Sequence, residues 1–143
     1  MKIAIGCDHT AIDCKQTVME YLEAIGHDVK DFGCYSKASC DYPKIARPVA
    51  EAVAGGEYQR GILICGTGLG MSYVANKVKG IRAACVSEPV SAALARQHND
   101  AQLLCFGTRI VGSEVAKQLV RVFIDTEFSG EVRHQMRLDM IEE

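Results

Sequence analysis

Residues 62–72, ILICGTGLGMS, contain the transition that decides the fold. The apolar run that ends at Cys65 is typical of a buried strand in a parallel sheet. Glycine then occupies every second position, at Gly66, Gly68 and Gly70. Because glycine lacks a Cβ atom, such a loop can turn sharply into a helix and bring its backbone N–H groups close to a ligand. The stretch therefore predicts a strand, a glycine loop and a helix that begins near residue 71.

The same alternation recurs along the whole chain, where short apolar runs are each followed by a longer segment of helical period. Repeated strand–helix units predict a single α/β domain over residues 1–143, with a five-stranded parallel sheet covered by helices on both faces. The expected strands are 2–8, 27–33, 61–65, 81–87 and 102–107. The expected helices are 12–25, 43–54, about 71 onward, 89–98 and 113–125, with a short charged helix at the C-terminus.

The composition excludes several classes of protein. An apolar content of 48% among 143 residues is enough for one sizeable core. A formal net charge of −2 offers no basic surface for nucleic acid. No stretch approaches the roughly 20 apolar residues of a membrane span, and the N-terminus lacks the pattern of a signal peptide. We therefore expect a soluble cytoplasmic protein that binds neither nucleic acid nor membranes.

Cysteine is frequent, with seven residues, but the number is odd and no C-x-x-C pair occurs. This pattern argues against a disulfide framework or a zinc site. It indicates reduced thiols that mostly serve as small core residues, as we expect for Cys7, Cys85 and Cys105. Cys65 differs because it directly precedes the glycine loop. Backbone N–H groups at the start of a helix favour the thiolate over the thiol, so Cys65 is a candidate base or nucleophile.

In an open parallel sheet, ligands bind beyond the carboxyl ends of the strands. That edge should present four short segments, at 8–9, 65–70, 87–88 and 107–109. The glycine loop could hold a phosphate, or an oxyanion that develops on a substrate. A nucleotide site remains an alternative, because Glu88 lies about where a ribose-binding acid would fall. The glycine spacing, however, is G-x-G-x-G rather than G-x-G-x-x-G.

Several other side chains fit either a structural or a chemical role. Asp8 and His9, at the tip of the first strand, either form a turn or project into the crevice. His98 closes a helix, where the helix dipole favours a cation. Arg133 and Arg137 lie four residues apart on one face of the last helix, where they could grip a phosphate or belong to a solvated basic face. Together with the thiol and the glycine loop, these groups fit proton transfer on a small phosphorylated substrate.

Seven short motifs also carry a specific resemblance: GCDH at 6–9, DYP at 41–43, CGTGLGMS at 65–72, ANKVKGIRA at 75–83, SEP at 87–89, RQHND at 96–100 and GTRIVG at 107–112. In this order, and over nearly the whole chain, they resemble the type B ribose-5-phosphate isomerase family, which also contains allose-6-phosphate and galactose-6-phosphate isomerases. The resemblance implies a Rossmann-like three-layer α/β/α sandwich that needs no metal and no cofactor. It also implies a homodimer or homotetramer whose active sites are shared between two subunits.

The resemblance further implies roles for individual residues. Cys65 would be the base that moves a proton between carbons 1 and 2 of the sugar through an enediolate. His98 would protonate the ring oxygen and so open the cyclic sugar. Asp8, Thr67 and Asn99 would bind substrate hydroxyl groups, with Tyr42 nearby. The enediolate would be stabilised by Gly66, Thr67, Gly68, Leu69 and Gly70, and the phosphate would be bound by His9, Arg109, Arg133 and Arg137.

The sequence departs from the family pattern at the walls and the phosphate end of this pocket. Thr10 and Ala11 stand where a glycine is usual, and Val90 replaces a frequent aromatic residue. The tail FSGEVRH is one residue longer ahead of Arg133 than usual, which leaves open whether Arg133 still reaches the phosphate. Ribose 5-phosphate and ribulose 5-phosphate are the expected pair. The alternatives are allose 6-phosphate, galactose 6-phosphate or a tetrose phosphate, or a non-catalytic partner subunit that only binds a sugar phosphate.

Overall fold

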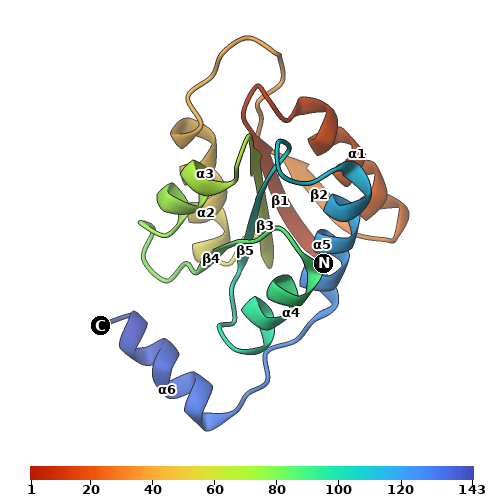
Figure 1. Ribbon diagram of the computed structural model, residues 1–143. Helices are drawn as coiled ribbons and strands as arrows, with labels where there is room; N and C mark the ends of the chain where they lie inside the picture. The colour runs from red at the N-terminus through yellow and green to blue at the C-terminus, as the bar shows by residue number, and fades with distance from the viewer.

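Five parallel strands form one sheet in the computed structural model, which describes residues 1–143 (Figure 1). The strands are β1 (Lys2–Cys7), β2 (Asp28–Asp31), β3 (Arg60–Cys65), β4 (Ala83–Cys85) and β5 (Leu103–Gly107). They are arranged in the order β2-β1-β3-β5-β4, with every neighbouring pair parallel. The chain therefore places β2 on one side of β1 and then returns to build the rest of the sheet on the other side. The strand order reverses between β1 and β3, which is where a ligand is expected.

Helices cover both faces of this sheet and complete the predicted Rossmann-like α/β/α sandwich. One face packs against the apolar sides of α1, α4 and α5, and the other against those of α2 and α3. The sixth helix, α6, follows α5 at the end of the chain. The helices are α1 (Ile12–Ala24), α2 (Pro43–Ala54), α3 (Leu69–Ala75), α4 (Pro89–Gln97), α5 (Ser113–Asp125) and α6 (Val132–Ile141). None of them is both long and apolar enough to cross a membrane.

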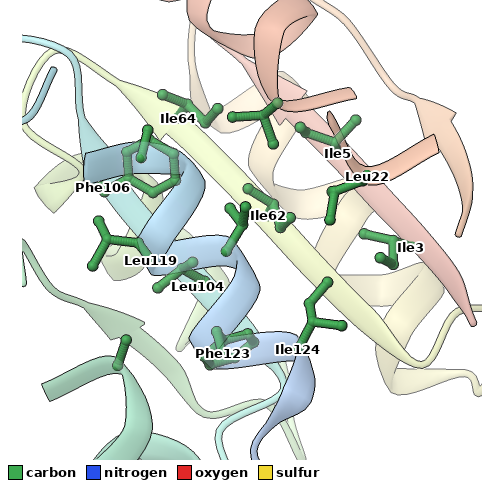
Figure 2. Packing of buried hydrophobic residues seen from close by; sticks show 14 of the residues in the cluster. Ile3, Ile5, Leu22, Ile62, Ile64, Leu104, Phe106, Leu119, Phe123 and Ile124 are labelled. Carbon is green, nitrogen blue, oxygen red and sulfur yellow. The ribbon is translucent and has the colours of Figure 1, made fainter. Parts of the chain in front are cut away.

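The two apolar layers follow from the period of two in each strand. Ile62 and Ile64 of β3 contribute to the cluster under α1 and α5, whereas Leu63 contributes to the cluster under α2 and α3. Figure 2 shows the first of these clusters, with Phe123 of α5 and Leu104 of β5 packed beside Ile62. The five residues named in this paragraph are fully buried, with 0% of their surface exposed to solvent. Burial of each such side chain contributes about 1.5–3 kcal/mol, so the apolar runs of the sequence fix the sheet.

The predicted elements are all present, but two differ in extent. β4 covers three residues rather than seven. It is an edge strand, and the residues that lead into it are held by hydrogen bonds to side chains rather than by pairing with a neighbouring strand. The Arg82 N–H donates to Gln102 Oε1, and the Ala83 N–H donates to Asn76 Oδ1, both at 2.8 Å. The other difference concerns α3, which begins at Leu69, about two residues earlier than expected.

The C-terminal helix α6 lies away from the glycine loop, at the opposite end of the molecule (Figure 1). His134 and Leu138 are 5% and 3% exposed and anchor its inner side. On its outer side, three apolar residues spaced four apart are mostly exposed, at 76% for Val132, 54% for Met136 and 61% for Met140. The helix thus has one apolar side that the rest of the chain covers and another that it leaves free.

Candidate active site

A cleft opens where β1 and β3 end side by side, at the point where the strand order reverses. Cys65 is the last residue of β3, and Asp8 directly follows β1, where its N–H donates to the Ile64 carbonyl oxygen at 3.1 Å. The cleft has a volume of about 440 Å³, within the range of small-molecule sites. It is lined by Asp8, His9, Thr10, Tyr42, Cys65, Gly66, Thr67, Gly70, Tyr73 and Arg109.

The Cys65 thiol sits at the start of the glycine loop, and its residue is only 5% exposed. The Gly68 N–H points at the sulfur and donates to Sγ at 3.1 Å. The N–H groups of the two intervening residues, Gly66 and Thr67, have no hydrogen-bond partner within the chain. The Gly68 N–H thus faces the sulfur, and the free N–H groups of Gly66 and Thr67 can hold an oxyanion on a bound substrate.

Two of the three loop glycines have separate steric reasons to be present. Gly68 has φ +82°, in the left-handed region, and a Cβ atom there would lie 2.8 Å from the Phe106 Cα. A Cβ atom on Gly70 would lie 2.6 Å from the Tyr42 ring, so the tyrosine packs directly on the loop. The loop therefore fits between β5 and Tyr42 only because these two positions carry no side chain.

Asp8 is 8% exposed and is the only carboxylate that lines the cleft. Its Oδ1 accepts two hydrogen bonds from Thr10, one from the N–H at 2.9 Å and one from the hydroxyl at 2.6 Å. This arrangement fixes the plane of the carboxylate and leaves Oδ2 for a ligand. Sequence reasoning noted Thr10 only as a departure from the family pattern. A threonine two residues after an aspartate can form such a turn, which is the signal that could have identified it.

The cleft also contains cationic and aromatic groups. Arg109, just beyond β5, is exposed and forms no ion pair. His9 Nδ1 accepts a hydrogen bond from the Cys40 N–H at 3.3 Å, which leaves the proton on Nε2 when the ring is neutral. Tyr42 and Tyr73 are 40% and 64% exposed. Tyr73 was missed by sequence reasoning, although it follows Gly70 by three residues and so shares a face of α3 with it.

The remaining predicted residues form a second group near the end of α4 and the start of α6. The rings of His98 and His134 lie 4.4 Å apart between centroids. The pKa of His134 is lowered first by burial and next by the charge of His98. The charges of Arg133 and Arg137 lower it further. Arg133 Nε donates to Glu131 Oε2 at 2.6 Å. This group is therefore cationic, with one acidic residue beside it.

The structure does not bring this second group into the cleft. α4 returns from the carboxyl edge of the sheet toward the amino end of β5, so it ends at the opposite edge of the sheet from the glycine loop (Figure 1). His98 and Asn99 directly follow α4 and therefore lie at that opposite edge. The Asn99 carbonyl oxygen instead accepts a hydrogen bond from Arg82 Nε at 2.8 Å, beside the start of β4. Within one chain, the predicted site residues are thus split between two places.

The loop residues Gly68 and Leu69 also lie outside the lining of the cleft. Gly68 is buried against β5, and Leu69, which is 48% exposed, faces a neighbouring hollow that it shares with Thr67 and Cys85. Gly68 contributes only its N–H to the thiol.

Two other predictions are settled by local structure. Glu88 caps the N-terminus of α4, where its carboxylate accepts hydrogen bonds from the N–H groups of Val90 and Ser91, both at 2.7 Å. Hydrogen bonds from Ser91 lower the pKa of Glu88. The carboxylate is therefore engaged, which argues against the nucleotide alternative. The prediction that Cys85 is a core residue is wrong, because it ends the edge strand β4 and is exposed.

The other cysteines divide by depth. Cys7, Cys65 and Cys105 are buried, whereas Cys14, Cys34 and Cys40 are half-buried. The expectation of mostly core thiols therefore holds for fewer than half of the seven.

Comparisons with known proteins agree on one family. The model of the Ribose/Galactose Isomerase family matches residues 3–141. The chain is 50% identical over 140 residues to ribose-5-phosphate isomerase B of Escherichia coli (strain K12), covering 98% of this chain and 93% of that protein. It is 46% identical over 132 residues to D-erythrulose-4-phosphate isomerase of Pectobacterium atrosepticum, covering 91% of this chain and 86% of that protein. The solved structure of ribose-5-phosphate isomerase B from Clostridium thermocellum superposes with a TM-score of 0.97 at 46% identity, covering 99% of this chain and 95% of that one.

Proposed function

The chain belongs to the ribose/galactose isomerase family and is a sugar phosphate isomerase, and from that premise we propose that it interconverts ribose 5-phosphate and ribulose 5-phosphate with Cys65 as the base. One observation carries the proposal: a buried thiol accepts a backbone N–H and adjoins two free N–H groups in a cleft with a single carboxylate and an unpaired arginine. A base beside an oxyanion hole is the arrangement that proton transfer next to a carbonyl group requires.

In the proposed reaction, the Cys65 thiolate removes the proton from carbon 2 of the open-chain aldose. The electron pair of that C–H bond forms the double bond between carbons 1 and 2, and the carbonyl π electrons move to oxygen 1. The free N–H groups of Gly66 and Thr67 stabilise the resulting enediolate. Return of the proton to carbon 1, with loss of the proton from oxygen 2, gives the ketose. Asp8, held by Thr10, binds a substrate hydroxyl group and can carry a proton between the two oxygens.

We further propose that a second copy of the chain completes this site. His98, which would open the sugar ring, and Arg133 and Arg137, which would bind phosphate with His9 and Arg109, lie too far round the sheet to act on a sugar at Cys65 of the same chain. The exposed apolar side of α6, formed by residues 132, 136 and 140, supports a contact with another copy. Asn99 would reach the substrate in the same way.

The chemistry and the substrate can be tested together by proton NMR of the protein in D₂O with ribose, allose, galactose and erythrose phosphates. Deuterium at carbon 2 of recovered aldose, or at carbon 1 of the ketose, would demonstrate proton transfer and identify the substrate. Cys65→Ala should lower turnover by roughly 10²- to 10⁴-fold, the usual contribution of a positioned base. Cys14→Ala, at a half-buried thiol on α1, is the matched control and should leave turnover unchanged. Near-full activity of Cys65→Ala would remove the thiol from the mechanism.

The shared site can be tested by mixing two inactive variants, Cys65→Ala and His98→Asn. A mixed dimer would contain one site with both residues intact and one site with neither. If subunits exchange at random, half of the dimers are mixed and about one quarter of wild-type activity returns. A site built within one chain predicts no recovery, because every chain then carries one defect.

A tetrose phosphate is the second candidate substrate, since one of the similar proteins is a D-erythrulose-4-phosphate isomerase. A tetrose is one carbon shorter, so the phosphate would have to sit closer to Cys65. Preferred turnover of the erythrose derivative in the same substrate panel would select this alternative. Absence of turnover with every sugar would instead favour a sugar-phosphate-binding partner subunit.

A further inference from the structure

Arg82, the residue directly before β4, has no role in the proposed mechanism, yet its guanidinium reaches two distant parts of the chain. Nε donates to the Asn99 carbonyl oxygen at 2.8 Å, and Nη2 donates to the Asp100 carbonyl oxygen at 3.3 Å. Nη1 donates to the Glu142 carboxylate at 2.6 Å, directly after the end of α6. One side chain therefore connects the turn after α4 with the end of α6.

The backbone of Arg82 is also held in place. Its N–H donates to Gln102 Oε1 at 2.8 Å, and its carbonyl oxygen accepts a hydrogen bond from the Gln102 N–H at 3.0 Å. The Arg82 side chain is only 17% exposed. A guanidinium is planar and carries five donors in a fixed fork, so it can bind two carbonyl groups and a carboxylate at the same time. Arg82 thus acts from a fixed base with a rigid group.

The turn that Arg82 binds carries two residues proposed to act on the sugar, His98 and Asn99. Both are exposed, and Arg82 binds only the backbone carbonyl group of Asn99. The next residue, Asp100, has a left-handed backbone with φ +44°, which residues with a side chain seldom adopt. Its carboxylate accepts a hydrogen bond from the buried Arg96 at 2.8 Å. Two arginines therefore hold the turn by its backbone and by Asp100, and the side chains of His98 and Asn99 stay free for a ligand.

α6 is attached to the rest of the chain near both of its ends. Near its start, the His134 ring lies 4.4 Å from the His98 ring between centroids. Near its end, two hollows of about 380 and 300 Å³ are each lined by both Arg82 and Ile141. The ion pair between Arg82 and Glu142 crosses this loosely packed region. It therefore holds the end of α6 at a place where apolar packing is incomplete.

We propose that Arg82 is a positioning residue for the isomerase reaction, which holds the turn after α4 and the end of α6 as one unit. The inference rests on the proposed function, in which His98 opens the sugar ring and Arg133 and Arg137 of α6 bind the phosphate. One sugar must meet both groups, so their spacing decides whether its ring oxygen reaches His98 while its phosphate is bound. A displacement of about 1 Å at a reacting group can cost about 100-fold in rate. Loss of Arg82 should therefore lower kcat, although Arg82 does not touch the substrate.

A double-mutant cycle tests whether Arg82 acts through His98, with ribose 5-phosphate or the sugar that the substrate panel selects. Arg82→Gln should lower kcat by roughly 10- to 100-fold. In the His98→Asn background the same change should lower kcat by less than about 3-fold, because the residue that it positions is gone. Equal losses in both backgrounds, as a merely structural role predicts, would refute the role of Arg82 alone. A wild type that turned over no sugar would refute the proposed function, and this role with it.

Three single variants complete the test. Arg82→Lys keeps the charge but loses the fork, so a wild-type kcat in this variant would overturn the proposal; it also replaces Arg82→Gln in the cycle if that variant does not fold. Glu142→Gln breaks only the link to α6 and should raise KM by up to about 5-fold with little change in kcat, because the ion pair is partly exposed. An unchanged KM would refute the link to α6. Arg121→Gln is the matched control, since Arg121 pairs with Asp125 on its own helix, and it should leave kcat unchanged.

Mixing of variants gives a readout that a general loss of stability would not produce. Because Arg82 is assigned to the group that contains His98, Arg82→Gln mixed with Cys65→Ala should regain about one quarter of wild-type activity. Arg82→Gln mixed with His98→Asn should regain none. Recovery with His98→Asn, or with neither variant, would overturn the proposal. If Cys65→Ala and His98→Asn do not complement each other, the shared site is refuted, and the cycle within one chain still decides the role of Arg82.

Discussion

Gly68 and Gly80 offer a pair of substitutions that separates two steric effects. Both glycines have nearly the same left-handed backbone, with φ +82° and φ +83°. A Cβ atom on Gly68 would lie 2.8–2.9 Å from the Cα, C and N atoms of Phe106, whereas a Cβ atom on Gly80 would meet no atom within 4 Å. Substitution by alanine therefore imposes the same backbone cost at both positions and a clash at only one.

The magnitudes follow from these contacts. A left-handed backbone costs a residue with a side chain about 1–2 kcal/mol, which is the loss expected for Gly80→Ala. At Gly68 the obstacle is the backbone of β5, which is paired on both sides and cannot rotate away, so overpacking adds about 1–3 kcal/mol. Gly68→Ala should therefore lower the free energy of unfolding by about 2–5 kcal/mol.

Urea unfolding followed by circular dichroism measures both losses, since the chain contains no tryptophan for fluorescence. All samples need one protein concentration, because association would shift the midpoint. The reasoning is refuted if the two variants lose the same stability, since the contact with Phe106 would then have no cost. Gly68→Ala should also lower kcat more than Gly80→Ala, because it displaces the N–H that points at the Cys65 sulfur.

Two further predictions concern side chains that form hydrogen bonds close to their own position in the chain. Thr10→Val should lower kcat/KM by about 10-fold or more, because it removes the hydroxyl that donates to the Asp8 carboxylate. Thr10→Ser keeps that hydroxyl and should retain kcat/KM. Thr17→Val removes a hydroxyl on the outside of α1 and should leave kcat/KM unchanged. Glu88→Gln should lower the melting temperature at pH 7 by weakening the cap of α4. The folded-state pKa of Glu88 lies below its ordinary value of 4.5. The difference in melting temperature between the wild type and Glu88→Gln should therefore be present above pH 4.5 and shrink as the pH falls through the folded-state pKa. A constant difference in melting temperature from about pH 7 to about pH 3 would contradict the role of Glu88 as a cap.

The position of the cleft could be predicted from the sequence because it depends on local signals. An apolar run that stops at Cys65 and is followed by glycine identifies the carboxyl end of a strand, and the strand order then places Asp8 beside it. The contact of Tyr42 with Gly70 could not be predicted in the same way. It depends on the path of the loop between β2 and α2, residues 32–42, which has no regular structure and which the hydrophobic period does not determine.

The position of His98 lies between these cases. A helix that leads from one parallel strand to the next must return to the amino edge of the sheet, so the end of α4 is opposite to Cys65 by topology alone. The separation of the two groups was thus available from the order of the predicted elements. What the order could not provide is the place of α6, because no strand follows it and its docking depends on the side chains of His134 and Leu138.

This separation bears on how substrate choice can change in such a protein. The groups proposed for proton transfer lie on the ends of β1 and β3 and are held by the sheet, so their spacing varies little. The groups proposed to open the ring and to bind most of the phosphate lie at the end of α4 and on α6. If a second copy completes the site, as proposed, the distance from Cys65 to the phosphate would be set by the contact between copies and by the length of the chain ahead of Arg133. In that arrangement an added residue in this segment would alter the length of sugar that fits while leaving the base and the glycine loop untouched.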